Sequence, residues 1–424
     1  MSSTEYEIDP DGIPPPRRST RWSLRGRGRW IALGLAIALI AVLTALTIFS
    51  RTDWGRARVL DYTLQLLGGR LNGHLTVNSL DGNLLTGAKL HGITLSDSTG
   101  VEMARVDSAY IRYRLATLTG GDIAIGLLRV WGADVHIFRL PGDTLWNYQG
   151  ILQDPTPSAD PGAPSATLIE ELELYDTFVR IRLPLAVDSR LPQARQEEEM
   201  QLILADTARW LLDRSGDDYM RTTRVDIAEA RVEELFIGPD ERGGVFLRVL
   251  DGVSDVRLWK DPPLRIRSVQ GELHLRDGLV NFRAPNIELD DSRAQSVGRI
   301  DMRGDRPLYD VYLTSSEFSF SDLRWLYPWL PDDPDAGGGS GKLWVEDRDE
   351  GLFVVARDAI VEMPETRITG QFGLISDPAE DALRFVDVDL EAEPLRIESV
   401  EQLLPEDLPV EGLVIGGATI RGEI

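Results

Sequence analysis

Apolar and polar residues alternate with a period of two along most of the chain after residue 75, as at Leu273 and Leu275 on either side of a histidine. Successive side chains of a strand point to opposite faces, so this pattern predicts half-buried strands. Asp-Gly pairs at Asp81-Gly82, Asp251-Gly252 and Asp277-Gly278 favour tight turns between strands. We expect a mainly β protein built as one elongated, meandering sheet, with compact sandwiches as the alternative.

A different pattern, an unbroken apolar run, extends from Trp30 to Phe49 and includes Leu35, Ile40 and Leu46. A helix of this length, at ~1.5 Å per residue, matches the roughly 30 Å hydrocarbon core of a bilayer. The run therefore predicts an N-terminal transmembrane helix over 30–49, with a buried helix as the alternative. Because the run is long and meets Arg51, we expect no cleavable signal peptide.

Basic residues without acidic neighbours lie just before the apolar run: Arg17, Arg18, Arg21, Arg25, Arg27 and Arg29. Positive charge resists translocation, so residues 1–29 are expected to form a cytoplasmic tail and the bulk of the chain to be exported. The predicted topology is single-pass.

Breaks in the alternating pattern divide the exported part. A membrane-proximal β region over 51–153 is expected to open with a short amphipathic helix from Asp53 to Leu67. Four prolines within residues 154–165 predict a linker or long loop.

A second β region is expected over 166–330, interrupted by one amphipathic helix near 193–213. The apolar stripe that predicts this helix consists of Met200, Ile203, Leu204, Trp210 and Leu211. Residues 331–341, rich in Asp and Gly, are expected to form a loop, and residues 342–424 further strands.

Charge and cysteine content exclude several classes of protein. The first 50 residues hold 6 of the 45 basic and 4 of the 69 acidic residues, so the remaining residues carry a net charge of −26. Such a body repels nucleic acid at long range, and we expect no nucleic-acid partner. The chain has no cysteine, which excludes disulfides, thiolate nucleophiles and cysteine-ligated metals.

No motif indicates catalysis. The histidines His74, His91, His136 and His274 are dispersed, and no HExxH, P-loop, GxSxG or strand-linked GxGxxG motif is present. The Asp332, Asp333 and Asp335 group resembles a calcium loop, but position twelve is Leu343 where a bidentate Glu is required. We therefore expect no enzyme activity, no metal and no cofactor.

Three aromatic residues near a proline, Trp325, Tyr327 and Trp329, have two interpretations. They could grip a ligand, or they could close the end of a hydrophobic core, and we favour the second.

The segment from Arg51 to Tyr148 resembles the amino-terminal region of the TamB group, in the AsmA-like superfamily of envelope proteins. The similarity lies in the order of features: the anchor, a short helix, LLGGRLNGHLTVNSLDGNLLTGAKLHGITLSD over Leu66–Asp97, a strand series over Asp107–Arg139, and LWNYQGIL over Leu145–Leu152. After Ser165 the resemblance is looser and consists of strand style and the segment Leu404–Ile424.

This resemblance implies an inner-membrane anchor that carries a long curved β groove, of the β-taco type, through the periplasm and conducts phospholipid towards the outer membrane. The candidate residues that line the groove are Leu273, Leu275, Val280, Phe282, Ile287 and Leu289. Charged neighbours such as Arg276, Arg283 and Glu288 would keep the other face wet. The alternative is that the same apolar residues fill a closed core.

The chain departs from the TamB pattern in its length, since TamB-type chains are usually longer and end in a domain that engages an outer-membrane protein of the Omp85 class. Ile424 falls within a predicted strand, which indicates a truncated product or a fragment of a longer chain. Two other functions remain open. One is a factor for translocation and assembly of outer-membrane proteins with an Omp85-class partner, and the other is a passive anchored scaffold.

Overall fold

The computed structural model describes residues 72–83, 87–113, 123–143, 146–152, 167–216, 218–238, 244–304, 307–348, 351–377, 382–401 and 412–423, together with residues 58 and 403. The predicted transmembrane segment 30–49, the linker 154–165 and, apart from Arg58, the helix predicted over 53–67 lie outside these residues.

Among the residues that the structure describes, no helix combines the length and the apolar character needed to cross a membrane.

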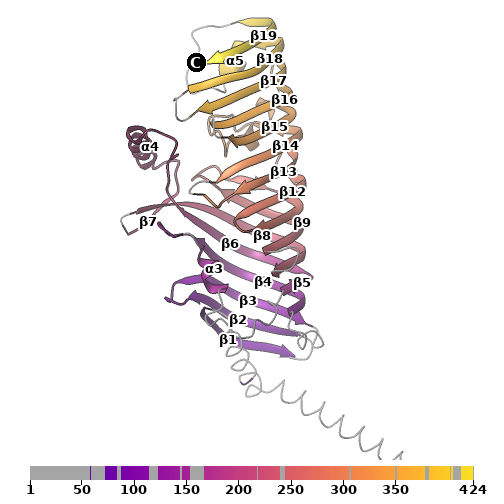
Figure 1. The fold of residues 1–424 in the computed structure, drawn as a ribbon. Coiled ribbons are helices and arrows are strands. Elements are labelled where there is room, and N and C mark those ends of the chain that lie inside the picture. Colours follow the sequence, from indigo (N-terminus) through magenta and orange to yellow (C-terminus); the bar gives the residue numbers. More distant parts are fainter. Residues whose placement is uncertain are drawn as a thin grey trace, which may run out of the picture.

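The described part of the chain forms one sheet of nineteen strands (Figure 1). Its first ten strands are β1 (Gly73–Asn83), β2 (Gly87–Asp97), β3 (Glu102–Tyr113), β4 (Ile123–Phe138), β5 (Thr167–Ile169), β6 (Leu172–Pro184), β7 (Leu212–Ser215), β8 (Asp218–Gly238), β9 (Gly244–Arg257) and β10 (Leu264–Ile266). The remaining strands are β11 (Ser268–Arg276), β12 (Leu279–Glu288), β13 (Arg293–Asp301), β14 (Leu308–Ser319), β15 (Gly338–Arg348), β16 (Gly351–Met363), β17 (Thr366–Asp377), β18 (Ala382–Arg396) and β19 (Leu413–Glu423).

Helices are few and short. They are α3 (Asn147–Leu152), α4 (Gln193–Ala205), α5 (Ile397–Glu401) and the 3-10 turns η2 (Ser321–Leu323) and η3 (Pro334–Ala336). The prediction of a mainly β protein with a single sheet is confirmed, and the sandwich alternative is wrong.

Most neighbouring strands are antiparallel, but β4 pairs in parallel with β5 and β6, so the sheet is mixed. The short strands β5, β7 and β10 extend the rows occupied by β6, β9 and β11. The sheet is therefore sixteen rows deep, which at about 4.8 Å per row gives a length of roughly 70 Å.

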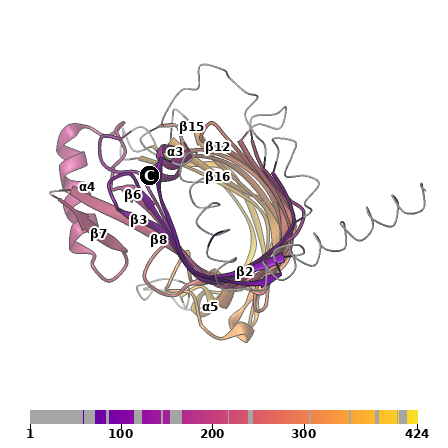
Figure 2. The same cartoon turned by 90° about the horizontal axis from the view of Figure 1, so that it is seen from below.

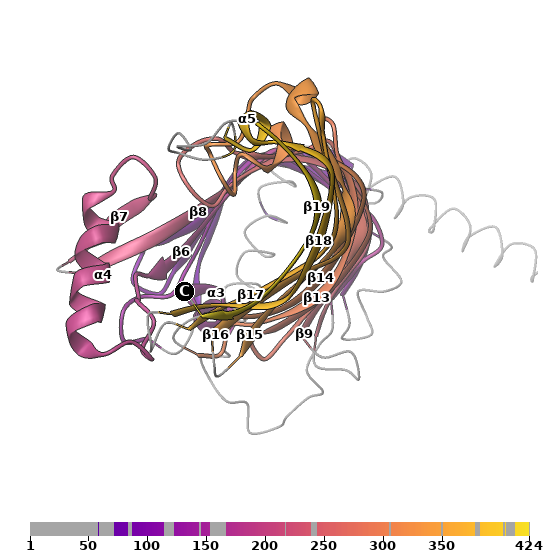
Figure 3. The same ribbon diagram turned by 90° about the horizontal axis from the view of Figure 1, so that it is seen from above.

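The sheet curves strongly across its width, and its cross-section is an open U (Figures 2 and 3). Register shifts recur at matching heights on successive strands, at Ala284/Ile287, Ser315/Phe318, Ala356/Ala359 and Phe385/Val388 among others. A β-bulge bends its strand and increases the local twist. Because these shifts face one another from row to row, they bend the whole sheet along one line.

In the amino-terminal strands, residues with positive φ, in the left-handed region, lie at the bend. Within their strands, Gly92, Gly132 and Asp176 have φ of 60°, 62° and 48°, respectively. A Cβ at Gly132 would lie 2.3 Å from Oδ2 of Asp107, and one at Gly92 would lie 2.2 Å from Nδ2 of Asn78. A glycine opposite a longer polar residue is therefore required at the corner of the sheet.

The expected Asp-Gly turns have different outcomes. Asp277-Gly278 joins β11 to β12 as a two-residue turn with positive φ at both positions (50° and 77°), as predicted. Asp81-Gly82 lies within β1 and Asp251-Gly252 within β9, so these two turn predictions are wrong. Gly252 is buried, and a Cβ there would lie 3.3 Å from Cγ1 of Val269, so the glycine serves packing between strands.

The helix predicted over 193–213 is shorter than expected, since α4 ends at Ala205. Trp210 packs edge-on against Trp259, with ring centroids 5.1 Å apart, and the carbonyl of Leu211 accepts a backbone hydrogen bond from Thr222. Trp210 and Leu211, at the end of the predicted stripe, therefore lie beyond the helix and contact Trp259 and, in β8, Thr222.

The loop predicted over 331–341 is also interrupted, because η3 occupies part of it and β15 begins at Gly338. A Cβ at Gly339 would lie 1.9 Å from the carbonyl oxygen of Ile360, and one at Gly338 would lie 2.0 Å from that of Phe318. These glycines mark a place where three strands approach closely, and composition alone does not distinguish this from a loop.

Gly339→Ala is expected to lower the stability of the sheet by about 1–3 kcal/mol, because the added methyl overlaps the backbone of β16. The measurement is the urea midpoint of the full-length protein in detergent. Gly150→Ala is the matched control, since a Cβ at that position in α3 meets nothing within 4 Å. The control should be neutral or slightly stabilising. An unchanged midpoint for Gly339→Ala would contradict the close approach of the strands.

Candidate functional site

The sheet brings the candidate apolar residues onto one face. Leu273 of β11 lies opposite Phe282 of β12, and Leu275 lies opposite Val280. Ile287 lies opposite Val269. Val269 is four residues before Leu273 in β11, so both side chains point to the same face of the sheet. We call the face that carries these residues the apolar face.

A bulge explains how Ile287 joins this face. Position 287 differs from 282 by an odd number, so a regular strand would place it on the opposite side. The shift between Ala284 and Ile287 adds one residue and returns Ile287 to the apolar face. Leu289 follows the last residue of β12, and its backbone N–H donates to the carbonyl of Ser292. It therefore lies just beyond the strand that was expected to hold it.

On β11 and β12, exposure differs between the two faces. The six candidate residues are half-buried, whereas Glu272, Arg276, Asn281 and Arg283, on the other face of the same two strands, are exposed. Phe282 lies beside Gly298 of β13, where a Cβ would come within 3.0 Å of its Cζ. The small residue leaves room for the aromatic ring.

The apolar face continues well beyond the candidate residues. In register with them lie the residues Val311 and Leu313 of β14, Leu343 and Val345 of β15, Val354 and Ala356 of β16, and Leu374 of β17. In the other direction it includes Val245 and Leu247 of β9 and Leu235 and Ile237 of β8. These residues were not among the candidates predicted from the sequence, although strand alternation was a signal for each of them.

The opposite face carries ionic and aromatic contacts. Arg129 of β4 binds Glu173 of β6, with its NH2 group 3.0 Å from Oε1, and the Tyr175 hydroxyl donates to Oε2 at 3.1 Å. The hydrogen bond from Arg129 holds the pKa of Glu173 below its usual value. Trp131 stacks on Tyr175 with centroids 6.0 Å apart, and Lys89 lies 5.3 Å above the Trp131 ring.

The aromatic segment at 325–329 does not close a core. Trp329 is 63% exposed and Tyr327 is 38% exposed, so the interpretation that we favoured for them is wrong. The backbone of this segment is held by short-range hydrogen bonds, such as Leu330 N–H to Tyr327 O at 3.2 Å, which turn the side chains outward.

The other polar residues considered as candidates, the aspartates near 332 and the histidines, do not come together in the fold. Asp332 forms an ion pair with Arg324, and His274 lies on the face opposite Leu273, next to Phe246. No group of three or more potential metal-ligating side chains is found among the described residues. The anchor residues and the six topology arginines lie outside those residues.

Comparison of the chain with protein-family models, with characterised proteins and with solved structures gives no match in any of the three. The resemblance to the TamB group therefore stays a prediction.

Glu173→Gln is expected to lower stability at pH 7 by about 1–3 kcal/mol, because Arg129 loses its charged partner. This is less than for a fully buried pair, since the Arg129 side chain is 37% exposed while that of Glu173 is 7% exposed. A lowered pKa contributes stability above the unfolded value of about 4.3 and loses it as pH falls through the folded value.

Urea midpoints at pH 7 and at pH 3 test this dependence, and the difference between wild type and Glu173→Gln should shrink at pH 3. Glu102→Gln is the control, because it breaks the exposed pair between Arg105 and Glu102 and should cost under about 0.5 kcal/mol. Equal destabilisation by Glu173→Gln at both pH values would rule out the ionic contribution.

Proposed function

We propose that this chain is a membrane-anchored periplasmic protein that holds phospholipid acyl chains against the apolar face of an elongated, β-taco-type groove. The observation that carries the proposal is the continuity of the apolar face from β8 to β17 in a sheet with no second layer among the described residues. Apolar surface of this extent, left without a covering layer, is typical of a binding surface.

Crowding of side chains supports assigning the apolar face to the concave side. Side chains on the inside of a curved sheet converge, and those on the outside diverge. Leu273, Leu275 and Phe282 are half-buried without a covering layer, and their charged neighbours on the other face are exposed. This is the pattern expected if the apolar residues line the inside of the U.

The energetics suit an acyl ligand. A 16-carbon chain in water costs about 0.8 kcal/mol per CH₂, or roughly 12 kcal/mol, and a continuous apolar lining removes most of that cost. The nine rows from β8 to β17 that carry the apolar face span roughly 40 Å at about 4.8 Å per row, which is longer than one extended acyl chain, so the face would accept lipid at successive positions.

The sequence supports the cellular setting. The apolar run at 30–49 and its arginine flank support an inner-membrane anchor with a cytoplasmic amino terminus, an arrangement in which the sheet would lie in the periplasm. The resemblance to TamB-type chains supports transfer of phospholipid from the inner membrane towards the outer membrane.

Leu275→Asp and Phe282→Asp are expected to abolish lipid contact, because each buries a carboxylate among acyl chains. The full-length protein is reconstituted in vesicles that contain a photoactivatable phosphatidylethanolamine with a diazirine in its acyl chain. Cross-linked peptides are then mapped by mass spectrometry, and wild type should label on the apolar face.

Val297→Asp is the matched control. Val297 is 49% exposed and lies opposite Arg283 on the other face, so this variant should keep wild-type labelling. Absence of labelling in the wild-type sheet, or equal labelling of all three variants, would refute the lipid function and favour the assembly-factor or scaffold functions.

A further inference from the structure

The ends of the strands form two rims along the length of the U. The first rim includes the Asp277-Gly278 turn, Gly304 and Asp347, where β11, β13 and β15 end. The second rim includes Pro184 at the end of β6 and Arg257 at the end of β9, because Arg224 pairs with Arg257 and Met220 with Pro184. The gap between the two rims is the open side of the curved sheet (Figure 3).

An arm made by residues 185–216 leaves the second rim between β6 and β8 and carries α4 and β7. In the views along the sheet it stands on the open side, away from the curved wall (Figures 2 and 3). Its base is tied to the second rim, since Lys260 N–H donates to the carbonyl of Arg209 at 2.8 Å and Trp210 packs against Trp259.

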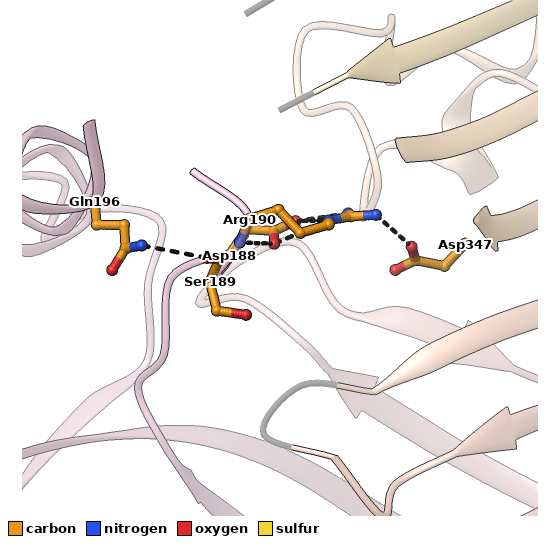
Figure 4. Close-up of polar contacts among 5 residues, drawn as sticks. All are labelled: Asp188, Ser189, Arg190, Gln196 and Asp347. Carbon is orange, nitrogen blue, oxygen red and sulfur yellow. Dashed lines mark hydrogen bonds and ion pairs between the residues drawn. The ribbon is translucent and has the colours of Figure 1, made fainter. Parts of the chain in front are cut away.

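The tip of the arm reaches the first rim. Arg190 lies 2.6 Å from Oδ2 of Asp188 within the arm, and its other terminal nitrogen lies 3.3 Å from Oδ1 of Asp347 (Figure 4). Gln196 at the start of α4 donates to the carbonyl of Leu191 at 2.6 Å, which fixes the turn that presents Arg190. We call Asp188, Arg190 and Asp347 the clasp. It joins the two rims across the open side.

A second contact crosses the same gap. Arg139 follows the end of β4 on the second rim, and its guanidinium donates to the carbonyl of Gly304 on the first rim at 3.4 Å. Two contacts, Arg190 with Asp347 and Arg139 with Gly304, therefore bridge the open side of the sheet at different positions along its length.

The arm is held less firmly than the sheet. No residue of α4 is buried, and Leu202 is 65% exposed. The Asp347 side chain of β15 is 5% exposed and that of Arg190 is 23% exposed, so the clasp is covered while α4, which follows Arg190 in the arm, is not. An element with little buried surface opens at a lower free-energy cost than the strands around it.

We propose that the arm is a lateral gate over the apolar face, latched by the clasp, through which an acyl chain enters or leaves the trough sideways. This inference rests on the proposed function. Arg190 stays paired with Asp188 when the arm moves, so opening separates Arg190 from Asp347 and leaves no isolated cation on the arm. The base at Trp210 and Trp259 acts as the hinge, and α4 moves as one body.

Spin labels test the movement without any lipid. The chain has no cysteine, so Gln201→Cys on α4 and Leu308→Cys on the first rim give a unique pair of labels. Pulsed electron paramagnetic resonance on the full-length protein in nanodiscs should give one narrow distance for the wild-type background. Asp347→Asn should broaden the distribution and lengthen the mean distance, because Arg190 loses its charged partner on the first rim.

Asp358→Asn is the matched control, because it breaks the ion pair, 2.7 Å long, between Asp358 of β16 and Lys342 of β15 without touching the clasp. This variant should keep the narrow distance. Identical distributions for Asp347→Asn and the control would overturn the latch, whether or not the protein binds lipid.

A reversible lock tests the passage of lipid. In an Arg190→Cys, Asp347→Cys variant, a short disulfide-containing bifunctional thiol reagent should join the arm to the first rim. Uptake of NBD-labelled phosphatidylethanolamine from phosphatidylglycerol vesicles should slow at least tenfold when the lock is closed and recover on reduction.

The two hypotheses fail in different ways. Unchanged uptake with a closed lock would overturn the gate while leaving lipid binding intact. Absence of uptake in every variant, together with a normal response of the spin labels, would overturn the lipid function and retain the latch only as a mobile arm.

Discussion

The bend of the sheet depends on a line of backbone irregularities that is repeated from strand to strand. A single bulge changes the direction of one strand, but here the shifts at Ser315/Phe318, Ala356/Ala359 and Phe385/Val388 stand next to their counterparts on adjacent strands. A flat sheet of this length would leave both faces equally open to water. The bend makes the two faces different. On β11 and β12 the apolar residues of one face are half-buried, while charged residues of the other face are exposed.

The bulges also decide which face of the sheet the following side chains point to. Ile287 shares a face with Phe282 only because an extra residue lies between them, and the same correction operates on neighbouring strands. Curvature and the continuity of the apolar face therefore have one cause. A substitution that removed a bulge would both flatten the sheet locally and turn the following side chains to the wrong side.

Strand alternation was sufficient to predict a mainly β chain in a single sheet and the shared face of Leu273 and Leu275, and the Asp-Gly pair predicted the turn at Asp277-Gly278. Alternation alone would have put Ile287 on the opposite face, because the bulge that returns it has no sequence signal. It could not predict which Asp-Gly pairs turn, because Asp251-Gly252 is decided by contact with Val269 across strands. Glycines at 338–341 have the composition of a loop, yet they belong to β15, since only the neighbouring backbones require their lack of a side chain. Likewise the helix ends at Ala205 because Trp210 has a partner elsewhere in the fold. The clasp joins residues 157 positions apart, and no local pattern signals it.

The order of the strands has a consequence for how the protein folds. From β11 to β19 each strand pairs with the next one along the chain, so this half consists of short-range contacts and resembles a stack of repeats. In the other half, β4 lies parallel to β6, and β6 pairs with β8 across the inserted arm, so longer loops must close before those strands meet. The carboxyl half is therefore expected to form first, row upon row, and the amino half to complete the sheet more slowly. Cooperativity along such a stack is limited to neighbouring rows, and the molecule can lose strands from one end while the rest stays folded.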